Sequence, residues 1–520
     1  MRRLIVIFTL SFFSVNVFGA YVAPAKDTVI AKGGLGDFTN ANDDNGGGAT
    51  KTAWDGGSPS DFINTNGGPI TSETGDGTTY DHTGNAKGER CLNETGIGTG
   101  VTVGTLVSIY DTGANVDDGI YEITNVVDAD NVLVANINAT DDDTVSYRVG
   151  GAFNTIQFAL DDPVNNGASY NRYIYFNEAE TITASIDVDQ FDGSTNTRIF
   201  IIGYNSTLAA ESAIVITTTT DLAGTGALVT FNGKGAYTEW RNIDFNGGGK
   251  DASRAEHCIE GSGTADGTYS WFINCEFQAA EDDGIQTRAS YQKFYNCEIH
   301  LHGGDGIAAT AATTGLGLMN CSIHDNDVHG VVANLTSAGE FSNCLTYDNG
   351  KDGAGDGMNF IAFINGFIEN CTSYGNAGDG LDLPVGANRV RILNTTSVGN
   401  DDYGFQLNSA PIASFYFGYN HAYDNDQDAG IAAGGDYCSA AASEALFQTL
   451  RHGSNQTGDP KFTNVADGSE DFTPTTGSDL INNGLEYGGT GTLDIGAIQE
   501  VSSGITTRSP GANLGGELQE

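Results

Sequence analysis

Residues 272–277 read FINCEF, and the same pattern returns as FYNCEI at 294–299, LMNCSI at 318–323 and FSNCLT at 341–346. In each copy an apolar residue stands two positions before an Asn, and a Cys follows that Asn directly. A small or apolar residue then comes two positions after the Cys. Weaker copies lie at 240–245, 368–373, 392–397 and 418–423. One short unit is therefore repeated from residue 240 to residue 423.

The Asn of each copy sets the period of this repeat. These Asn residues stand at 274, 296, 320, 343, 370, 394 and 420, which are 22, 24, 23, 27, 24 and 26 residues apart. A regular period of this length is the sequence signature of a solenoid, in which each repeat stacks on the one before it. The longest spacing indicates an insertion within residues 351–355.

The residues between the Asn positions predict the kind of solenoid. They are too rich in Gly, Asn and Asp for helices, and they predict strands of three to five residues joined by tight turns. A left-handed or bulged Asn explains why apolar alternation breaks at that position. We therefore expect a parallel β-helix with one column of stacked Asn amides and a second, buried column of free Cys thiols.

The rest of the chain divides by composition into further segments. We predict an all-β protein, with a small N-terminal antiparallel β unit before the solenoid and an irregular tail after it. The expected segments are a signal peptide (1–20), an irregular Gly- and Asp-rich lead-in (21–90), the β unit (91–150), the parallel β-helix with an N-terminal capping helix at 153–160 (151–435), a tail packed on the solenoid (436–499) and a disordered end (500–520).

The first twenty residues predict export. A basic start at Arg2 and Arg3 precedes an apolar run at 4–13, and small residues near Ala20 suit cleavage. The apolar run is too short to span a membrane, and no later segment approaches 18 consecutive apolar residues. We expect a secreted or surface-held protein outside the cell.

The charge of the chain limits its partners. There are 67 acidic residues against 22 Lys and Arg, giving a net charge of −45. Nucleic acids and anionic membranes are bound through Lys and Arg, so they are poor partners for this chain, and we expect no nucleic-acid partner and no membrane span. Two interpretations of the acidity stay open, namely solubility in a salty medium and carboxylates that hold divalent cations, calcium above all.

The repeat resembles that of a known group of proteins, and the tail of the chain strengthens this resemblance. It reads DPKF at 459–462, DF at 471–472, GSDLINNG at 477–484 and DIGAI at 494–498. With the repeat, this order resembles the secreted right-handed parallel β-helix proteins of the pectate-lyase-like superfamily, specifically bacterial exported members with a tail of this type. The resemblance implies a right-handed coil and an extracellular polysaccharide or cell-surface glycan as partner, but no particular reaction.

An acidic turn edge is the candidate site. Asp283, Asp305 and His329 precede a Gly in successive repeats, so stacking should place them above one another. Close carboxylates cannot both ionise freely, so one becomes a general acid with a raised pKa while the other acts as base or cation ligand. His329 would orient or share the proton. The competing interpretation is structural, because Asp before Gly is typical of a tight turn.

Further residues complete the candidate site. Calcium would bind at this edge through Asp282, Asp283, Asp305 and Asp327. Substrate would contact Arg288 and Lys293, which together with Lys351 are also the nearby basic groups that a lyase would need. Tyr347 and Tyr374 would stack on sugar rings.

Two classes of function follow from these residues. The first is a non-catalytic β-helix that binds polysaccharide or other surface ligands along an acidic, calcium-binding face. The second is a polysaccharide lyase or glycoside hydrolase that acts through the groove of Asp283, Asp305 and His329. The sequence leaves open whether the protein is an enzyme, and it gives no oligomeric state.

Overall fold

The computed structural model describes most of the solenoid and parts of the flanking segments. The described residues are 29–32, 68–71, 89–93, 103, 106–110, 119–135, 143–149, 156–160, 172–176, 179–188, 198–203, 212–222, 226–231, 237–250, 254–261, 263, 267–353, 355–384, 387–407, 416–425, 459–465, 471–478 and 480–481. The predicted signal peptide, the predicted disordered end and the DIGAI motif lie outside the described residues. No helix in the described ranges is long and apolar enough to cross a membrane.

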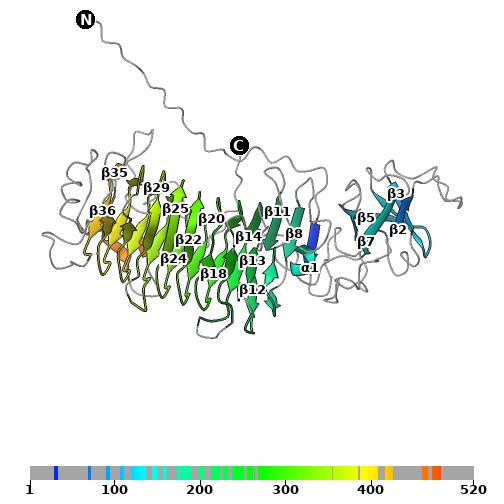
Figure 1. Cartoon of the computed structure of the whole chain (residues 1–520), viewed down its shortest axis with the longest axis horizontal. Coiled ribbons are helices and arrows are strands. Elements are labelled where there is room, and N and C mark those ends of the chain that lie inside the picture. The colour runs from blue at the N-terminus through cyan, green and yellow to red at the C-terminus, as the bar shows by residue number, and fades with distance from the viewer. Residues whose placement is uncertain are drawn as a thin grey trace, which may run out of the picture.

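Three parallel sheets form the solenoid, and each full coil gives one strand to each sheet in turn (Figure 1). The first sheet contains β1 (Val29–Lys32), β8 (Arg172–Phe176), β11 (Ile199–Gly203), β14 (Thr238–Arg241), β17 (Trp271–Ile273), β20 (Lys293–Tyr295), β23 (Gly317–Met319), β26 (Glu340–Ser342), β29 (Phe367–Glu369), β32 (Arg391–Leu393) and β35 (Tyr416–Gly418). The second contains β9 (Glu180–Ile182), β12 (Ile214–Thr218), β15 (Ile243–Asn246), β18 (Glu276–Gln278), β21 (Glu298–His300), β24 (Ser322–His324), β27 (Leu345–Tyr347), β30 (Thr372–Tyr374), β33 (Thr396–Val398) and β36 (His421–Tyr423). The third contains β10 (Ile186–Asp187), β13 (Val229–Phe231), β16 (Ile259–Gly261), β19 (Ile285–Gln286), β22 (Ile307–Thr314), β25 (Val331–Ser337), β28 (Met358–Phe363), β31 (Leu381–Leu383) and β34 (Phe405–Leu407). The predicted parallel β-helix is confirmed.

The repeated Asn joins the first sheet to the second. Asn274 and Asn296 have φ angles of 53° and 54°, in the left-handed region that Asn tolerates. The Asn296 amide donates to Asn274 Oδ1 at 2.8 Å, so the column is hydrogen-bonded from coil to coil. The placement of Asn420 in this column was wrong by one residue. Tyr419 takes the left-handed position with φ of 56°, and Asn420 follows it into the buried Cys position, where it bonds the Thr395 N–H.

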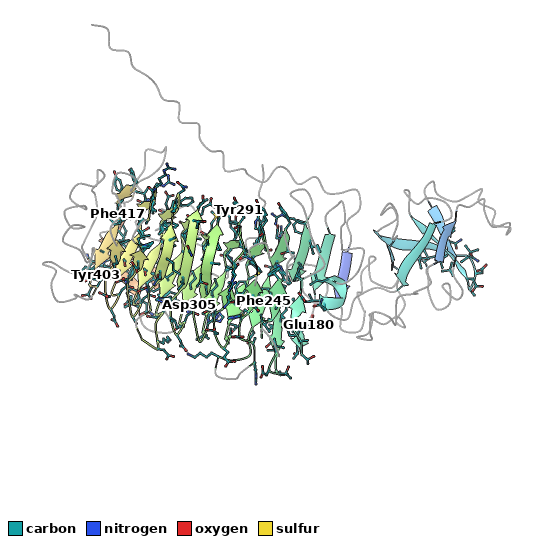
Figure 2. All side chains as sticks on the ribbon, viewed as in Figure 1. Glu180, Phe245, Tyr291, Asp305, Tyr403 and Phe417 are labelled. Carbon is teal, nitrogen blue, oxygen red and sulfur yellow. The ribbon has the colours of Figure 1, made fainter. Side chains whose placement is uncertain are left out.

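Large apolar side chains and thiols fill the interior. Phe272 and Phe294 are fully buried, and their ring centroids stack 5.0 Å apart, close to the spacing of neighbouring strands. Cys275, Cys297 and Cys321 form part of the buried column beside them and are free thiols. The hydrophobic interior is therefore ordered by stacking, with Phe245 and Phe417 among its members (Figure 2).

A short helix lies at the start of the solenoid. Helix α1 (Ile156–Leu160) lies within the predicted helix at 153–160, whose first three residues are outside the described residues, and it buries both of its terminal residues in the core. The Ile156 N–H donates to Glu180 Oε2 at 3.1 Å, so a carboxylate satisfies one free donor at its N-terminus.

An antiparallel barrel precedes the helix. It is formed by β2 (Gly68–Thr71), β3 (Glu89–Asn93), β4 (Leu106–Tyr110), β5 (Gly119–Val126), β6 (Asn131–Ala135) and β7 (Asp143–Val149). Because β2 pairs with both β3 and β7, the β unit starts at Gly68 and not at residue 91. Strand β1 pairs with β8, so part of the expected irregular lead-in belongs to the solenoid.

Part of the tail lies against the second sheet. Strands β37 (Phe462–Asn464) and β38 (Asp471–Pro474) pair antiparallel. Phe472 is 3% exposed and its ring lies 5.2 Å from the Tyr347 ring and 5.1 Å from the Tyr374 ring. Through these contacts Phe472 of the tail packs on Tyr347 and Tyr374 of the second sheet.

Candidate functional site

The stacked column of Asp283, Asp305 and His329 exists. The strand register pairs Ile285 with Ile307 and Ile307 with Val331, and it therefore stacks the residues two positions earlier. The same register extends the column at both ends. Its members are His257, Asp283, Asp305, His329, Asp356, Asp379 and Tyr403, and we call this set the turn ladder. Asp305 and Tyr403 mark its course along one edge of the solenoid (Figure 2).

Side chains of the turn ladder bond to the backbone of the next coil. Asp283 Oδ1 accepts the Asp305 N–H at 3.0 Å, and Asp305 Oδ1 accepts the His329 N–H at 3.0 Å. Asp356 N–H donates to His329 Nδ1 at 2.8 Å, so that nitrogen carries no proton and the imidazole is held in one tautomer. Further along, Asp379 accepts the Tyr403 N–H at 2.8 Å. The five rungs from Asp283 to Asp379 thus each accept a backbone N–H of the next coil.

From Asp283 onward each rung is followed by a Gly, which close packing requires. A Cβ on Gly306 would lie 2.6 Å from the Gly330 carbonyl oxygen, and one on Gly330 would lie 2.6 Å from that of Gly357. The Asp-Gly pairs are therefore explained by the turn itself: the Asp bonds the next coil, and the Gly lets that coil approach.

Burial perturbs the carboxyl groups of the turn ladder. It raises the pKa of Asp305 to about 6, with a further contribution from the charge of Asp283, while the His329 N–H opposes the rise. Burial likewise raises the pKa of Asp283, and it raises that of Asp379 to about 8. The prediction that stacked carboxyls at this edge are hard to ionise agrees with this geometry.

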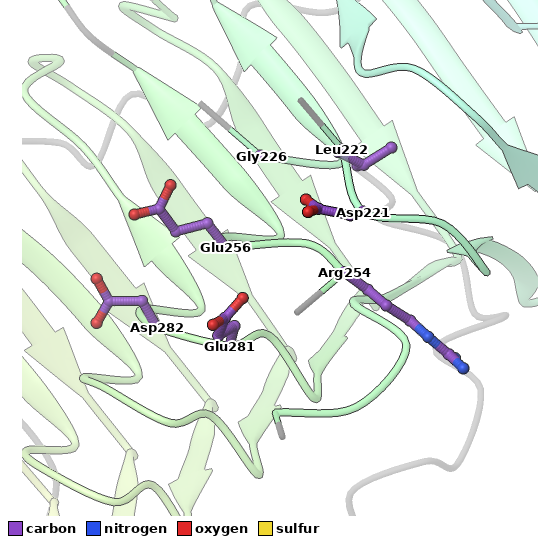
Figure 3. Close-up of a pocket in the computed structure, with 7 residues that line it drawn as sticks. All are labelled: Asp221, Leu222, Gly226, Arg254, Glu256, Glu281 and Asp282. Atoms are coloured by element: carbon purple, nitrogen blue, oxygen red, sulfur yellow. The ribbon is translucent and has the colours of Figure 1, made fainter. Parts of the chain in front are cut away.

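An acidic pocket of about 500 Å³ opens beside the first rungs (Figure 3). It is lined by Asp221, Leu222, Gly226, Arg254, Glu256, Glu281 and Asp282. The Arg254 side chain extends away from the acidic groups and donates to the Gly248 carbonyl oxygen at 2.7 Å. Within the described part of the chain, the four carboxylates of Asp221, Glu256, Glu281 and Asp282 have no hydrogen-bond or ion-pair partner. All four of these side chains are exposed, whereas the carboxylates of Asp283 and Asp305 in the turn ladder are buried or half-buried and accept backbone N–H groups.

One histidine connects the acidic pocket to the turn ladder. His257 is 3% exposed, and its Nδ1 lies 3.1 Å from the Asp283 carbonyl oxygen. That oxygen only accepts, so Nδ1 carries the proton and Nε2 keeps a lone pair. Ligand atoms of Glu256, His257 and Asp282 lie within 4.8 Å of one another, close enough to share a cation.

The other predicted site residues lie in different surroundings. Asp327 is buried and pairs with Lys250, whose Nζ lies 2.5 Å from Asp327 Oδ1. Lys293 belongs to the first sheet and pairs with Glu340 at 2.5 Å. Arg288 is exposed in the turn after β19. The structure thus brings Asp282, Asp283, Asp305 and His329 to one edge.

The predicted sugar-stacking tyrosines are on another sheet. Tyr347 and Tyr374 end strands β27 and β30 of the second sheet and contact Phe472 of the tail. Their half-buried rings form an aromatic cluster with Phe472 of the tail.

The sequence-based prediction missed a second Asn ladder and most of the acidic pocket. Asn326, Asn349, Asn376 and Asn400 are buried, and each bonds the next, for example from the Asn326 amide to Asn349 Oδ1 at 2.9 Å. Their position five residues after the Cys position was a readable signal. Glu256 and His257 lie between Asn242 of the weak first copy and Asn274, which are 32 residues apart, so the later spacing of 22 to 27 residues did not predict their position in the coil.

Comparison with known proteins agrees with the fold. The family model described as the right-handed beta helix region matches residues 174–361, about a third of the chain. This match supports the right-handed β-helix and the superfamily resemblance. It does not reach the tail, whose resemblance stays a prediction. No curated protein matches the sequence.

Solved structures show a similar architecture at low identity. Pectate lyase Pel9A is 16% identical with a TM-score of 0.48, over 68% of this chain and 92% of that one. The Azotobacter vinelandii mannuronan C-5 epimerase AlgE4 A-module is 15% identical with a TM-score of 0.37, over 58% and 90%. The catalytic domain of a GH87 alpha-1,3-glucanase is 12% identical with a TM-score of 0.28, over 72% and 91%. These values are too low to indicate a shared activity.

Proposed function

We propose that this protein is a non-catalytic, extracellular β-helix that binds polysaccharide through calcium held in the acidic pocket. The observation that carries the proposal is the contrast between two neighbouring sets of carboxylates. Those of the turn ladder are bonded to backbone N–H groups, whereas Asp221, Glu256, Glu281 and Asp282 are free to bind.

The charge of the pocket favours a cation. Four carboxylates share one opening, and its single Arg side chain is bonded elsewhere. Calcium takes six to eight oxygen ligands with flexible geometry, which suits carboxylates from separate turns. The remaining positions would be filled by hydroxyl or carboxylate oxygens of a glycan. The sequence resemblance to secreted β-helix proteins makes polysaccharide the ligand class to test first.

The turn ladder supports a binding function over a catalytic one. A general acid needs an oxygen that reaches the substrate, but both carboxylate oxygens of Asp283 are in hydrogen bonds, one to the Asp305 N–H and the other to the Gln286 amide at 3.4 Å. The unprotonated nitrogen of His329 is likewise occupied by the Asp356 N–H. One observation favours the enzyme as the second candidate: Asp305, with a pKa of about 6, could be protonated near neutral pH.

A panel assay separates these two candidates. The full chain without its first twenty residues is tested against neutral and acidic polysaccharides for binding by affinity electrophoresis, in calcium and in chelator. The same mixtures are tested for new reducing ends and for unsaturated uronates. Calcium-dependent retardation without cleavage supports the proposal. Cleavage that is lost in Asp305→Asn supports the enzyme.

Two variants tie the binding to the pocket. Glu256→Gln combined with Asp282→Asn removes two charges from exposed positions and should abolish the retardation. Asp401→Asn removes the same kind of charge from an exposed position in a distant coil, and it should bind like the wild type. Equal loss in both variants would show that only the net charge matters.

A further inference from the structure

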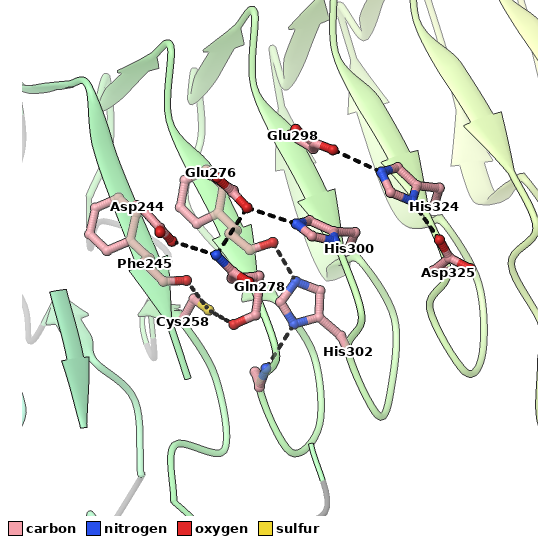
Figure 4. A network of polar contacts seen from close by, with 12 residues as sticks. Asp244, Phe245, Cys258, Glu276, Gln278, Glu298, His300, His302, His324 and Asp325 are labelled. Atoms are coloured by element: carbon pink, nitrogen blue, oxygen red, sulfur yellow. Dashed lines mark hydrogen bonds and ion pairs between the residues drawn. The ribbon is translucent and has the colours of Figure 1, made fainter. Parts of the chain in front are cut away.

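A polar network lies on the outer face of the second sheet, away from the acidic pocket (Figure 4). It runs across β15, β18, β21 and β24 in four successive coils. Its members are Asp244, Glu276, Gln278, Glu298, His300, His324 and Asp325. Two of these are imidazoles, which distinguishes this network from an acidic cluster.

The two histidines are neighbours in register. The pairing of β21 with β24 places His300 beside His324, and their rings stack at 4.9 Å and 24°. His300 Nε2 lies 3.0 Å from Glu276 Oε1, and His324 Nε2 lies 3.1 Å from Glu298 Oε1. Ligand atoms of Glu298, His300 and His324 all lie within 4.8 Å of one another.

A contact between the His324 Nδ1 atom and Asp325 fixes the orientation of the His324 ring. Its Nδ1 lies 2.8 Å from Asp325 Oδ2, and the carboxylate of Asp325 also pairs with Lys351. A carboxylate on Nδ1 sets the tautomer of a histidine so that Nε2 presents its lone pair to a metal. On its other side the His324 ring stacks on Tyr347 at 4.5 Å, which holds the ring plane.

We propose that this network is a zinc site, with His300, His324, Glu298 and Glu276 as ligands. The ion would replace the protons now shared between each imidazole and its carboxylate. Zinc bonds of about 2.0–2.2 Å in a tetrahedron set neighbouring donors about 3.3 Å apart. Two of the present N–O separations are already near that value.

The remaining adjustment falls on mobile groups. The Glu276 and Glu298 side chains are 38% and 46% exposed, so they can rotate inward, whereas the histidines at 13% and 9% are held. Two imidazoles and two carboxylates suit zinc and its neighbours in the transition series, while calcium prefers oxygen alone. The site therefore differs in chemistry from the acidic pocket.

Metal titration tests this inference directly. The full chain, prepared without a histidine tag and stripped with chelator, is titrated with zinc alone by calorimetry and with cobalt(II) by visible spectroscopy. We expect one zinc per chain and the absorption bands of tetrahedral cobalt. Glu298→Gln and His300→Ala should each weaken zinc binding at least about 100-fold, and Asp325→Asn about 10- to 100-fold.

Matched controls separate this site from the other imidazoles and carboxylates of the protein. His329→Asn removes an imidazole from the turn ladder and should leave zinc binding unchanged, as should Glu256→Gln with Asp282→Asn in the acidic pocket. Metal-free circular dichroism must match the wild type, and Glu298→Gln at an exposed position is the variant that best preserves the fold. If the wild type binds no zinc, or if Glu298→Gln and His300→Ala bind zinc as tightly as the wild type, the inference is overturned and the network consists of ion pairs only.

Discussion

Replacing Asp305 by Asn and by Ala separates its charge from its hydrogen bond. In the folded chain Asp305 Oδ1 accepts the His329 N–H at 3.0 Å, and burial raises the pKa of the carboxyl group from 3.8 to about 6. Asn keeps an acceptor oxygen and removes the charge. Ala removes both. If Asp305 is a rung of the turn ladder, the two variants should differ in stability and not in any activity.

The size of each effect follows from the structure. A raised pKa means that the folded chain disfavours the ionised carboxyl, so wild-type stability is full below about pH 4 and falls as the pH rises through about 6. With one pKa unit at about 1.4 kcal/mol and partial solvent screening, the loss is on the order of 1–3 kcal/mol. The side chain of Asp305→Asn does not ionise, so this variant does not lose stability as the pH rises. Asp305→Ala also avoids this loss but leaves a backbone N–H without a partner, which costs about 1–3 kcal/mol.

Thermal unfolding followed by circular dichroism measures both effects. At pH 8 the Asn variant should melt above the wild type, and at pH 4 the two should coincide. The Ala variant should melt below the Asn variant at both values, with each kcal/mol worth about 2–4 °C or less in a chain of this size. Equal melting temperatures for Asn and Ala would refute the hydrogen-bonded rung, and a wild type that melts above the Asn variant at pH 8 would refute the buried charge.

Three more predictions test other parts of the structure. Burial raises the pKa of Cys297, so the native protein should resist alkylation there and react only in denaturant, as shown by mass spectrometry; rapid native labelling would contradict the buried column. Lys250→Met should cost about 1–3 kcal/mol by chemical unfolding because it strands the buried Asp327 carboxylate, and Asp327→Asn should remove most of that cost; purely additive effects would rule out the ion pair. Phe472→Ala and Tyr347→Ala should couple by about 0.5–1.5 kcal/mol in a double-mutant cycle of melting temperatures, and zero coupling would show that the tail does not hold the second sheet.

The fold was predictable because its information is periodic. Copies such as 272–277 and 294–299 repeat both residue types and spacing, so each confirms the phase of the other. The weak copy at 418–423 shows the limit. The residue type suggested Asn420 for the column, but hydrogen-bond register places Tyr419 there, and register depends on the whole coil.

The site was predictable only in part. Stacking of Asp283 on Asp305 follows from the period, and the structure has it. The N–H groups that these carboxylates bind depend on the direction of each turn, which side-chain spacing does not encode. The acidic pocket uses Asp221 and Glu256, which lie before the even spacing of the repeat begins at Asn274. Contacts between Tyr347 and Phe472 join segments too far apart in the chain for any local pattern to reveal.

We propose different roles for the two sets of carboxylates: those of the acidic pocket bind a cation, while those of the turn ladder bond the backbone of the next coil. Calorimetric titration with calcium distinguishes the two roles, using the wild type, Asp305→Asn and the pair Glu256→Gln with Asp282→Asn. We predict that the wild type and Asp305→Asn bind calcium alike and that the pocket variant has lost binding while its fold is retained. Calcium binding that survives in the pocket variant but disappears in Asp305→Asn would contradict this division of roles.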